Sequence, residues 1–374
     1  MTMTRLAPVV CCDQRDHDPA WDAFAVQVPG GHHVQTSLWA QVKRVLGWQA
    51  ARITLRREEE IVGGAQVLYR RLARFWHVGY VTNGPLTRAD ASVHLEQLVS
   101  ELRRFSRRKR MVLLTVQPPK HDTVLVEQLP RWGFRSGRMA VAPTASVVID
   151  LSIGLEHIMA RMHPSTRQGI RRGLRRGVEV HQGAGDDIPR FYALHVATSR
   201  RQGFVPYPLE YFTTMWRVLH EYDYIRLFIA QVKGEDVAAQ VVVPFADTVI
   251  SKMIGWSGTH SEYQPNRVLD WAVIQWAADA GYRFFDLEGI NPDVARLVLA
   301  GQPLPKSHHN TTTAYKLGFG GQVVLYPGPY DHCYCPPLHW VYHRVAGELS
   351  DRALLKRVVG RIQGRRATST DAAW

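Results

Sequence analysis

The sequence predicts an α/β protein of two tandem domains, each with a mixed central sheet flanked by helices. The chain has 374 residues, and its composition of 45% hydrophobic and 21% charged residues is that of a globular protein. This length is more than twice that of a typical domain. In addition, strands, a long helix and a returning strand follow one another in the same order in each half of the chain, so we expect a duplicated architecture.

The first half begins this pattern with two alternating strands around an acidic turn. A third strand follows, then an amphipathic helix that ends in a run of basic residues, and then an apolar strand. Cations in the last turn of a helix interact favourably with its dipole. We predict strands over 51–57, 61–69, 75–81 and 111–116 and a helix over 89–108.

The second half repeats this order, with strands over 225–232, 237–245, 249–256 and 282–287 and a helix over 267–280. One apolar face of that helix contains Val268, Leu269, Ala272, Val273, Trp276 and Ala277. Gly281 is positioned to end the helix. A meander followed by a helix and a returning strand is the core arrangement of acetyltransferase-like (GNAT-like) folds. We expect domains over residues 1–145 and 146–333, followed by a disordered tail at 364–374, which is rich in Ala, Thr and Ser.

The formal net charge of +13 indicates a polyanionic partner such as nucleic acid, a phosphorylated substrate or an anionic membrane surface. One basic cluster, 103–110, is explained by a solvated helix end. The other, a predicted basic helix over 161–176, has six arginines and no acid. Like charges four residues apart destabilise a helix, so we favour phosphate binding there. The stripe consists of Arg167, Arg171 and Arg175, with Arg172 and Arg176 beside it.

Neither a membrane span nor a metal site is expected. No apolar run approaches the roughly 20 residues of a membrane helix, and the N-terminal region lacks a signal-peptide core, so we expect a cytoplasmic location. We also expect a monomer. Four cysteines make no disulfide framework. A cluster near the end of the chain has zinc-ligand residue types, but its Cys-x-Cys spacing before two prolines favours structural packing. It consists of His332, Cys333, Cys335, His339 and His343.

From Gln35 to about Asp331 the chain resembles the Fem family (FemA, FemB, FemX). Members of this family transfer an amino acid from aminoacyl-tRNA to an amine, usually in the peptidoglycan stem peptide. The resemblance implies two GNAT-like domains without a long coiled-coil arm, and a helical segment over 334–362 that returns to the first domain. The resemblance rests on these sequence segments: Gln35–Lys43, Asn83–Pro85, Arg176–Val180, Arg201–Gly203, Pro208–Phe212, Ile274–Ala277, Phe285–Ile290 and Tyr315–Gly321.

The resemblance also implies roles for single residues. Lys316, with Tyr315 beside it, matches the lysine that stabilises negative charge at the reacting carbonyl. Lys43, in the phrase that contains Trp39, matches a lysine that contacts phosphate of the acceptor. Two positions depart from the family pattern: Tyr207 stands where an acceptor-binding arginine is expected, and Gln117 where an aspartate is expected. Both departures affect acceptor recognition, so a natural-product or antibiotic intermediate is an alternative to a peptidoglycan precursor.

An amino acid esterified to ribose is already activated, so the enzyme must mainly hold amine and ester together and stabilise the oxyanion. We assign the stabilisation of this oxyanion to Lys316. Asp286 or Glu288, at the end of a core strand, could accept the proton of the amine. Trp256 and Tyr263 could line an aminoacyl or acceptor pocket. No cofactor is expected besides aminoacyl-tRNA as co-substrate.

Two other functions fit the same fold. An acyl-coenzyme A N-acyltransferase normally has a glycine-rich pyrophosphate loop at a helix start. The segments 171–173 and 175–177 contain the right residue types without that spacing. A non-catalytic RNA-binding protein is the second alternative, since basic stripes bind phosphate without catalysis.

Overall fold

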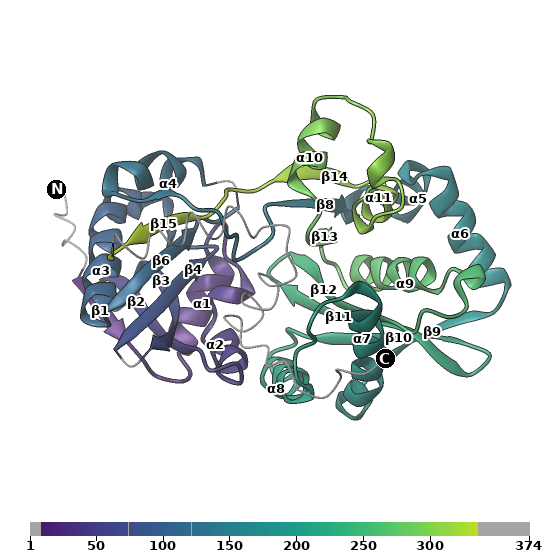
Figure 1. Cartoon of the computed structure of the whole chain (residues 1–374), viewed down its shortest axis with the longest axis horizontal. Helices are drawn as coiled ribbons and strands as arrows, with labels where there is room; N and C mark the ends of the chain where they lie inside the picture. Colours follow the sequence, from purple (N-terminus) through teal and green to yellow (C-terminus); the bar gives the residue numbers. More distant parts are fainter. Residues whose placement is uncertain (1–8, 74, 121, 336–374) are drawn as a thin grey trace. The chain divides into compact units, whose positions relative to one another are not determined.

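The computed structural model describes residues 9–73, 75–120 and 122–335, which divide into two compact units (Figure 1). The first unit contains residues 9–142 and returns at 326–335, and the second contains residues 143–325. Each unit has its own mixed sheet and its own hydrophobic core. The predicted fold class is therefore confirmed.

The sheet of the first unit is antiparallel except where β4 and β6 pair in parallel. Helix α3 crosses between those two strands, because parallel neighbours need a long connection. The strands in spatial order are β1 (Val9–Asp13), β2 (Gln49–Arg57), β3 (Glu60–Ala73), β4 (Trp76–Thr82), β6 (Met111–Gln117), β15 (Tyr330–Cys333) and β7 (Arg135–Ser136), with β5 (Leu86–Thr87) on β3. The α-helices are α1 (Pro19–Gln27), α2 (Ser37–Arg44), α3 (Leu95–Arg108) and α4 (Thr123–Gln128).

The sheet of the second unit has the same single parallel pairing, here between β12 and β13. Its order is β14 (Gln322–Leu325), β8 (Ala145–Asp150), β13 (Phe284–Asp286), β12 (Thr248–Trp256), β11 (Glu235–Phe245), β10 (Arg226–Val232) and β9 (Val178–Gly183). The α-helices are α5 (Leu155–Arg161), α6 (Pro164–Arg175), α7 (Ile188–Gln202), α8 (Leu209–His220), α9 (Pro265–Asp279), α10 (Pro292–Leu299) and α11 (Thr312–Leu317).

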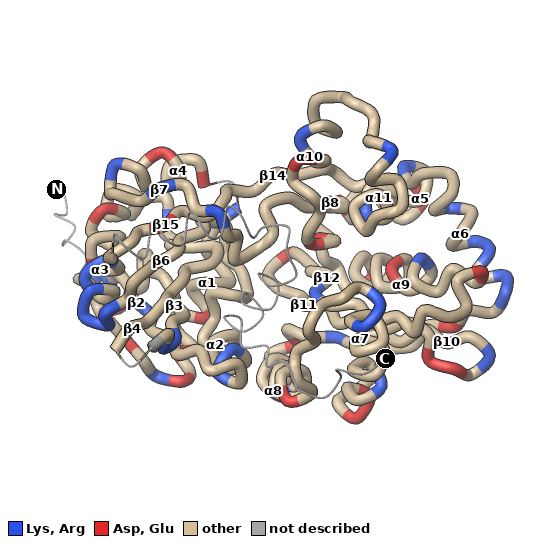
Figure 2. The backbone as a smooth tube through the Cα atoms, viewed as in Figure 1, with Lys and Arg blue, Asp and Glu red and all other residues tan. Residues whose placement is uncertain are grey.

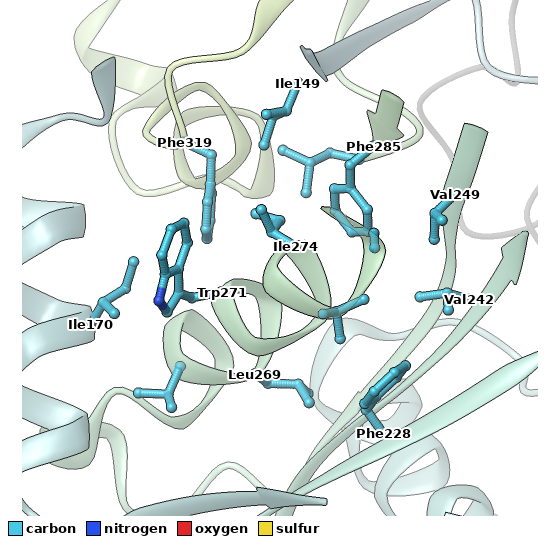
Figure 3. Packing of buried hydrophobic residues seen from close by; sticks show 14 of the residues in the cluster. Ile149, Ile170, Phe228, Val242, Val249, Leu269, Trp271, Ile274, Phe285 and Phe319 are labelled. Atoms are coloured by element: carbon cyan, nitrogen blue, oxygen red, sulfur yellow. The ribbon is translucent and has the colours of Figure 1, made fainter. Parts of the chain in front are cut away.

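Helix α9 forms the centre of the second core (Figure 3). Leu269 and Ile274 are buried among side chains of the strands and of the segment after α11, including Phe285 and Phe319. Burying one such aliphatic side chain contributes about 1.5–3 kcal/mol. Four residues of the predicted apolar face are buried in this core: Val268, Leu269, Val273 and Ala277. The core also takes Trp271 and Ile274, which were not part of the predicted face, whereas the predicted Ala272 and Trp276 are half-buried.

The predicted meander strands and long helices of both halves are observed, with differences at their ends. The helix predicted over 89–108 begins as a short 3-10 helix, Ala89–His94, before α3. The basic helix predicted over 161–176 is interrupted, because proline restricts the residue before it and cannot donate a backbone hydrogen bond. Arg161 therefore ends α5, and α6 begins at Pro164 with His163 as its N-cap.

The boundaries of the units also differ from the predicted ranges. The first break lies at residues 142–143 rather than 145–146, since β8 belongs to the second sheet. The return to the first unit begins at Tyr326, inside the range predicted for the second domain, because β15 pairs with β6. Of the helical segment predicted over 334–362 only residues 334–335 are described, and the tail at 364–374 lies outside the described residues.

The longest described helices, α7 and α9, have 15 residues each, so the described part of the chain contains no coiled-coil arm. None of the described helices is both long enough and apolar enough to cross a membrane.

Candidate active site

The candidate site lies where β12 and β13 separate in the second unit. The two strands pair in parallel over only three residue pairs, ending at Ile250 and Asp286. Beyond that point the loop after β13 turns toward α11 and brings several polar side chains together. We call this group the polar cluster: Gln240, Ser251, Lys252, Asp270, Asp286, Glu288, Tyr315 and Lys316.

Lys316 is anchored to the backbone of this loop. Its ammonium donates hydrogen bonds to the carbonyl oxygens of Glu288 and Gly289, the latter at 2.9 Å. Both loop residues have positive φ, 42° and 77°, and this left-handed turn lets both carbonyls accept from one ammonium. An ammonium has three N–H donors. Among the described residues, the carbonyl oxygens of Glu288 and Gly289 are the acceptors recorded for this ammonium.

Burial lowers the pKa of Lys316 from its usual value, and the negative charges of Glu288, Asp270 and Asp286 oppose that effect. A cation in a partly dehydrated site interacts more strongly with a developing negative charge than a cation in water does. The environment therefore suits the electrostatic role predicted for Lys316.

Tyr315 donates a hydrogen bond from its hydroxyl to Oδ2 of Asp270 at 2.6 Å. Burial raises the pKa of Asp270 to about 6, opposed by the Tyr315 hydrogen bond, the Lys316 charge and Gln240. The pKa of Tyr315 is well above its usual value because of burial and the neighbouring Asp270. Tyr315 therefore acts as a neutral donor that ties α11, and with it Lys316, to α9.

Asp270 was not among the residues predicted from the sequence. The signal was present, because an aspartate lies between Leu269 and Trp271 on the apolar face of the clearest predicted helix. A carboxyl in such a position is 1% exposed here, and a buried carboxyl needs a partner. Its partner is 45 residues away in the sequence, so only the fold reveals it.

The two carboxylates proposed as proton acceptors are both engaged by protein groups. Asp286 is 1% exposed, and its Oδ1 accepts hydrogen bonds from the Ser146 hydroxyl and, at 2.9 Å, from the backbone N–H of Glu288. The carboxylate of Glu288 pairs with Nζ of Lys252, 3.0 Å from Oε1. These contacts favour a structural role for Asp286, which holds the turn that anchors Lys316.

The arginine stripe lies on α6, in the same unit (Figure 2). Arg167 is half-buried and donates to the carbonyls of Ala160 and Met162, so it caps the end of α5. Arg176 donates to the carbonyl of Glu262 and lies 5.8 Å from the ring centroid of Tyr263. The remaining three arginines are exposed, and no ion pair involves them within the described residues: Arg171, Arg172 and Arg175.

An open pocket of about 640 Å³ lies beside this stripe. It is lined by Leu155, Glu156, Met159 and Ala160 of α5, Arg167 and Arg171 of α6, and Trp271 and Gln275 of α9. Two guanidinium groups therefore border a partly apolar hollow.

The aromatic residues proposed for a substrate pocket have protein contacts of their own. Trp256 lies under the guanidinium of Arg201, with 4.4 Å to its ring centroid, and its indole N–H donates to the carbonyl of Thr259. Tyr207 is buried and stacks on Tyr211 with 4.4 Å between ring centroids. These contacts favour a packing role for Tyr207.

The other acceptor-binding candidates belong to the first unit, on and near helix α2 and at the end of β6. Trp39 is buried and packs edge-on against His33, while Lys43 is half-buried in the last turn of α2. Gln117 accepts from the backbone N–H groups of Val141 and Ala142 and donates to the carbonyls of Ala142 and Pro327. With these four hydrogen bonds, its amide favours a structural role at the point where the chain leaves and re-enters this unit.

No group of metal-ligating side chains suited to a metal ion occurs among the described residues, and His339 and His343 lie outside them. Burial, with the charges of Arg103 and Arg107, lowers the pKa of His332 to about 4. His332 packs against Phe134 and Tyr334.

Comparison with known proteins adds two kinds of likeness. The chain is 25% identical over 227 residues to a lipid II:glycine glycyltransferase of Staphylococcus haemolyticus, and 22% identical over 231 residues to one of Staphylococcus aureus (strain MRSA252). These alignments cover 58% and 59% of this chain and 54% and 55% of the relatives, so the chain spans about half the length of the curated relatives it matches.

Among solved structures, the crystal structure of FemX matches with a TM-score of 0.75 and 17% identity, covering 87% of this chain and 98% of FemX. A tandem GNAT protein from the clavulanic acid biosynthesis pathway matches with a TM-score of 0.50 and 12% identity, covering 84% and 92%. At these identities the likeness shows the fold, two tandem GNAT-like domains. The sequence model of the FemAB family matches residues 17–235, more than half of the chain, and the protein therefore belongs to the FemAB family.

Proposed function

We propose that this protein is an aminoacyltransferase that moves an amino acid from aminoacyl-tRNA to an amine of a peptidoglycan precursor. The anchored ammonium of Lys316 is the observation that carries the proposal, because it offers one fixed cationic donor in a partly dehydrated site. Membership of the FemAB family and the relatives that act on lipid II support the peptidoglycan acceptor.

In the proposed reaction, the acceptor nitrogen attacks the carbonyl carbon of the ester, and a C–N bond forms while the carbonyl oxygen becomes negative. Lys316 stabilises that oxyanion. When the C–O bond to ribose breaks, the ribose oxygen gains a proton and the attacking nitrogen loses one, so no net proton is consumed. Glu288 is a better candidate than Asp286 to relay this proton, since Asp286 is committed to Ser146 and the backbone of the turn.

The exposed arginines of α6 are proposed to bind phosphates of the tRNA. A guanidinium group matches phosphate in geometry as well as in charge. Arg171 lines the pocket beside α9, and Arg172 and Arg175 extend the positive surface along the helix. The stripe recognises phosphate rather than nucleotide sequence.

A transfer assay tests the donor and the chemistry together. Purified protein is mixed with tRNA charged with a labelled amino acid and with a precursor pentapeptide that bears a free amine. We expect labelled product that disappears when the charged tRNA is first treated with ribonuclease. Transfer that survives this treatment, or that needs acyl-coenzyme A, would support the acyl-coenzyme A alternative. RNA binding without turnover with any charged tRNA would support the binding-only alternative.

The nature of the acceptor is tested separately in the same assay. Replacing the precursor with simple amines should reduce transfer, because the proposal assigns the acceptor to peptidoglycan. Equal transfer to unrelated amines would favour a natural-product acceptor. That alternative arose because Tyr207 and Gln117 depart from the family pattern.

A further inference from the structure

The hairpin between β3 and β4 in the first unit ends in large apolar side chains that are exposed. Leu72 is 52%, Phe75 55% and Trp76 44% exposed. Hairpin turns normally use Gly, Asn, Asp or Pro, which tolerate both water and tight backbone geometry. Phe75 lies in this turn, while Leu72 and Trp76 lie at the facing ends of β3 and β4. Turn chemistry therefore does not account for the exposed Phe75, and large apolar side chains that gather on the surface mark interaction sites.

Sheet topology places a basic cluster at the same end of the sheet as this hairpin tip. Strand β4 pairs in parallel with β6, and His77 lies opposite Met111, the first residue of β6. The backbone N–H of His77 also donates to the carbonyl of Arg110. Because α3 runs directly into β6, its basic C-terminal turn lies beside the start of β4.

The cluster consists of Arg104, Arg107, Arg108, Lys109 and Arg110, and Figure 2 shows Lys and Arg segments gathered at this end of α3. Arg104 pairs with Glu101, whereas no described ion pair involves Arg107, Arg108 or Arg110. Lys109 lies over the rings of Tyr69 and Phe105, which keeps its ammonium at the sheet end. Arg71, on β3 next to Leu72, is also exposed.

We propose that this hairpin tip and basic cluster form a docking surface for an anionic lipid bilayer. Trp and Phe side chains are favoured at the level of the lipid headgroups, and Leu is favoured deeper in the acyl region. Arg and Lys beside them are attracted to anionic headgroups. The charge complementarity and the projecting apolar tip together match the surface of a membrane without any spanning helix.

A nucleic-acid partner explains only part of this surface. RNA would bind the arginines and could stack on Trp76 or Phe75, but Leu72 has no π face for stacking. A bilayer accommodates all three apolar side chains at once. The inference goes beyond the proposed aminoacyl transfer and does not depend on it, since binding to lipid is measured without any donor or acceptor.

Vesicle sedimentation tests the surface in the intact protein. We expect the protein to bind vesicles of phosphatidylcholine with phosphatidylglycerol at least about ten times more strongly than vesicles of phosphatidylcholine alone. Salt should weaken the binding, because it screens the attraction between the basic cluster and the lipid. No binding to the anionic vesicles would overturn the proposal.

Matched variants separate this surface from general stickiness. The double change Leu72→Ser with Trp76→Ser should weaken vesicle binding at least about tenfold. Val93→Ser with Leu174→Ser, which alters exposed apolar residues elsewhere, should leave it unchanged. Likewise, Arg107→Gln with Arg108→Gln should weaken binding, and Arg131→Gln with Arg135→Gln should not. Equal binding by the first variant and wild type contradicts a docking role for the hairpin.

Fluorescence quenching gives a second readout, which uses another variant and so does not depend on whether the serine variant folds. Trp76→Phe should retain vesicle binding but lose the quenching of tryptophan emission by brominated lipids. Unchanged quenching in Trp76→Phe would mean that Trp76 does not enter the bilayer. This result would overturn the proposal. A different result would show that the surface is an RNA interface instead. In that case wild type binds tRNA but not vesicles, and the variant with Leu72→Ser and Trp76→Ser no longer binds tRNA.

Discussion

Two backbone carbonyls fix the direction in which Lys316 points its positive charge. A free lysine side chain has considerable rotamer freedom, and its ordering during catalysis costs about 1–2 kcal/mol. In this protein the left-handed turn at Glu288 and Gly289 orders the ammonium before any substrate is present. A charge that is ordered in advance needs no reorganisation at the moment of reaction.

Replacing Lys316 should therefore affect the chemical step more than substrate binding. Lys316→Met removes the cation while keeping much of the side-chain volume, and we expect kcat to fall by about 10²–10³ with little change in KM. The exposed Lys306 offers a control, since Lys306→Met should leave both constants unchanged. Steady-state transfer assays measure the effect. Normal turnover in a folded Lys316→Met protein would remove the proposed mechanism.

Asp270 should make stability depend on pH in a defined window. Its pKa is raised from 3.8 to about 6, so between these values the native carboxyl holds its proton while the unfolded one releases it. The free energy of unfolding should therefore fall as pH rises from about 4 to about 6, by roughly 3 kcal/mol in all. Asp270→Asn should lose this dependence and keep an acceptor for the Tyr315 hydroxyl.

Urea unfolding at several pH values measures this difference between wild type and the variant. Asp279→Asn, on the exposed end of the same helix, should behave like wild type. Identical pH profiles for wild type and Asp270→Asn would show that Asp270 does not titrate in this range.

At the scale of single elements, helix α6 combines a glycine-containing buried face with a basic exposed face. A Cβ at Gly173 would lie 2.5 Å from the carbonyl oxygen of Tyr263 and 2.5 Å from Cγ2 of Val268. The glycine therefore lets α6 lie directly against α9 and its preceding turn. With this face packed, Arg171, Arg172 and Arg175 are exposed to solvent. Their positive charges repel one another along the helix.

The salt dependence of RNA binding should report the arginines of α6. Each arginine that contacts a single-stranded phosphate contributes about 0.7 to the slope of log affinity against log salt concentration. Arg171→Gln with Arg175→Gln should therefore lower both the affinity for tRNA and this slope, by about 1.4. Arg217→Gln, on the exposed side of α8, serves as the control. A double variant with an unchanged slope would place the RNA elsewhere.

At the scale of the whole molecule, the first unit is assembled from two distant parts of the chain. Strand β15 lies between β6 and β7, so residues 330–333 complete a sheet that otherwise uses residues before 143. The hydroxyl of Thr115 donates to Asp331 at 2.6 Å across a separation of 216 residues. The chain must therefore pass through the whole second unit before the first sheet is complete.

A chain that ends after Leu325 should consequently lose the folded first unit while keeping every strand of the second sheet. Without β15, strand β6 becomes an open edge and β7 loses its only described strand partner. We expect low solubility and loss of the cooperative unfolding transition of the first unit, measured by calorimetry beside the full chain. A soluble truncated protein with both transitions intact would contradict the structural importance of β15.

Long periodic segments were predictable because their side-chain period is a local property. The meander strands of both halves and helix α9 are examples, and each was predicted close to its observed ends. Short strands such as β14 and β15 were not predicted, because four residues hold too little pattern to distinguish a strand from a loop. Lys316, Tyr315 and Glu288 were candidates from the sequence, whereas Asp270 was found only through its contact with Tyr315.

The sequence by itself determined the duplicated α/β architecture, the basic character of α6 and the phrase that contains Lys316. These depend on neighbouring residues, whose spacing the covalent chain already sets. Only the tertiary structure decided that β15 completes the first sheet, that Lys316 is held by the turn after β13, and that the hairpin tip lies beside the basic end of α3. Each of these depends on contacts between distant segments, whose free energy is gained only after the chain between them has folded.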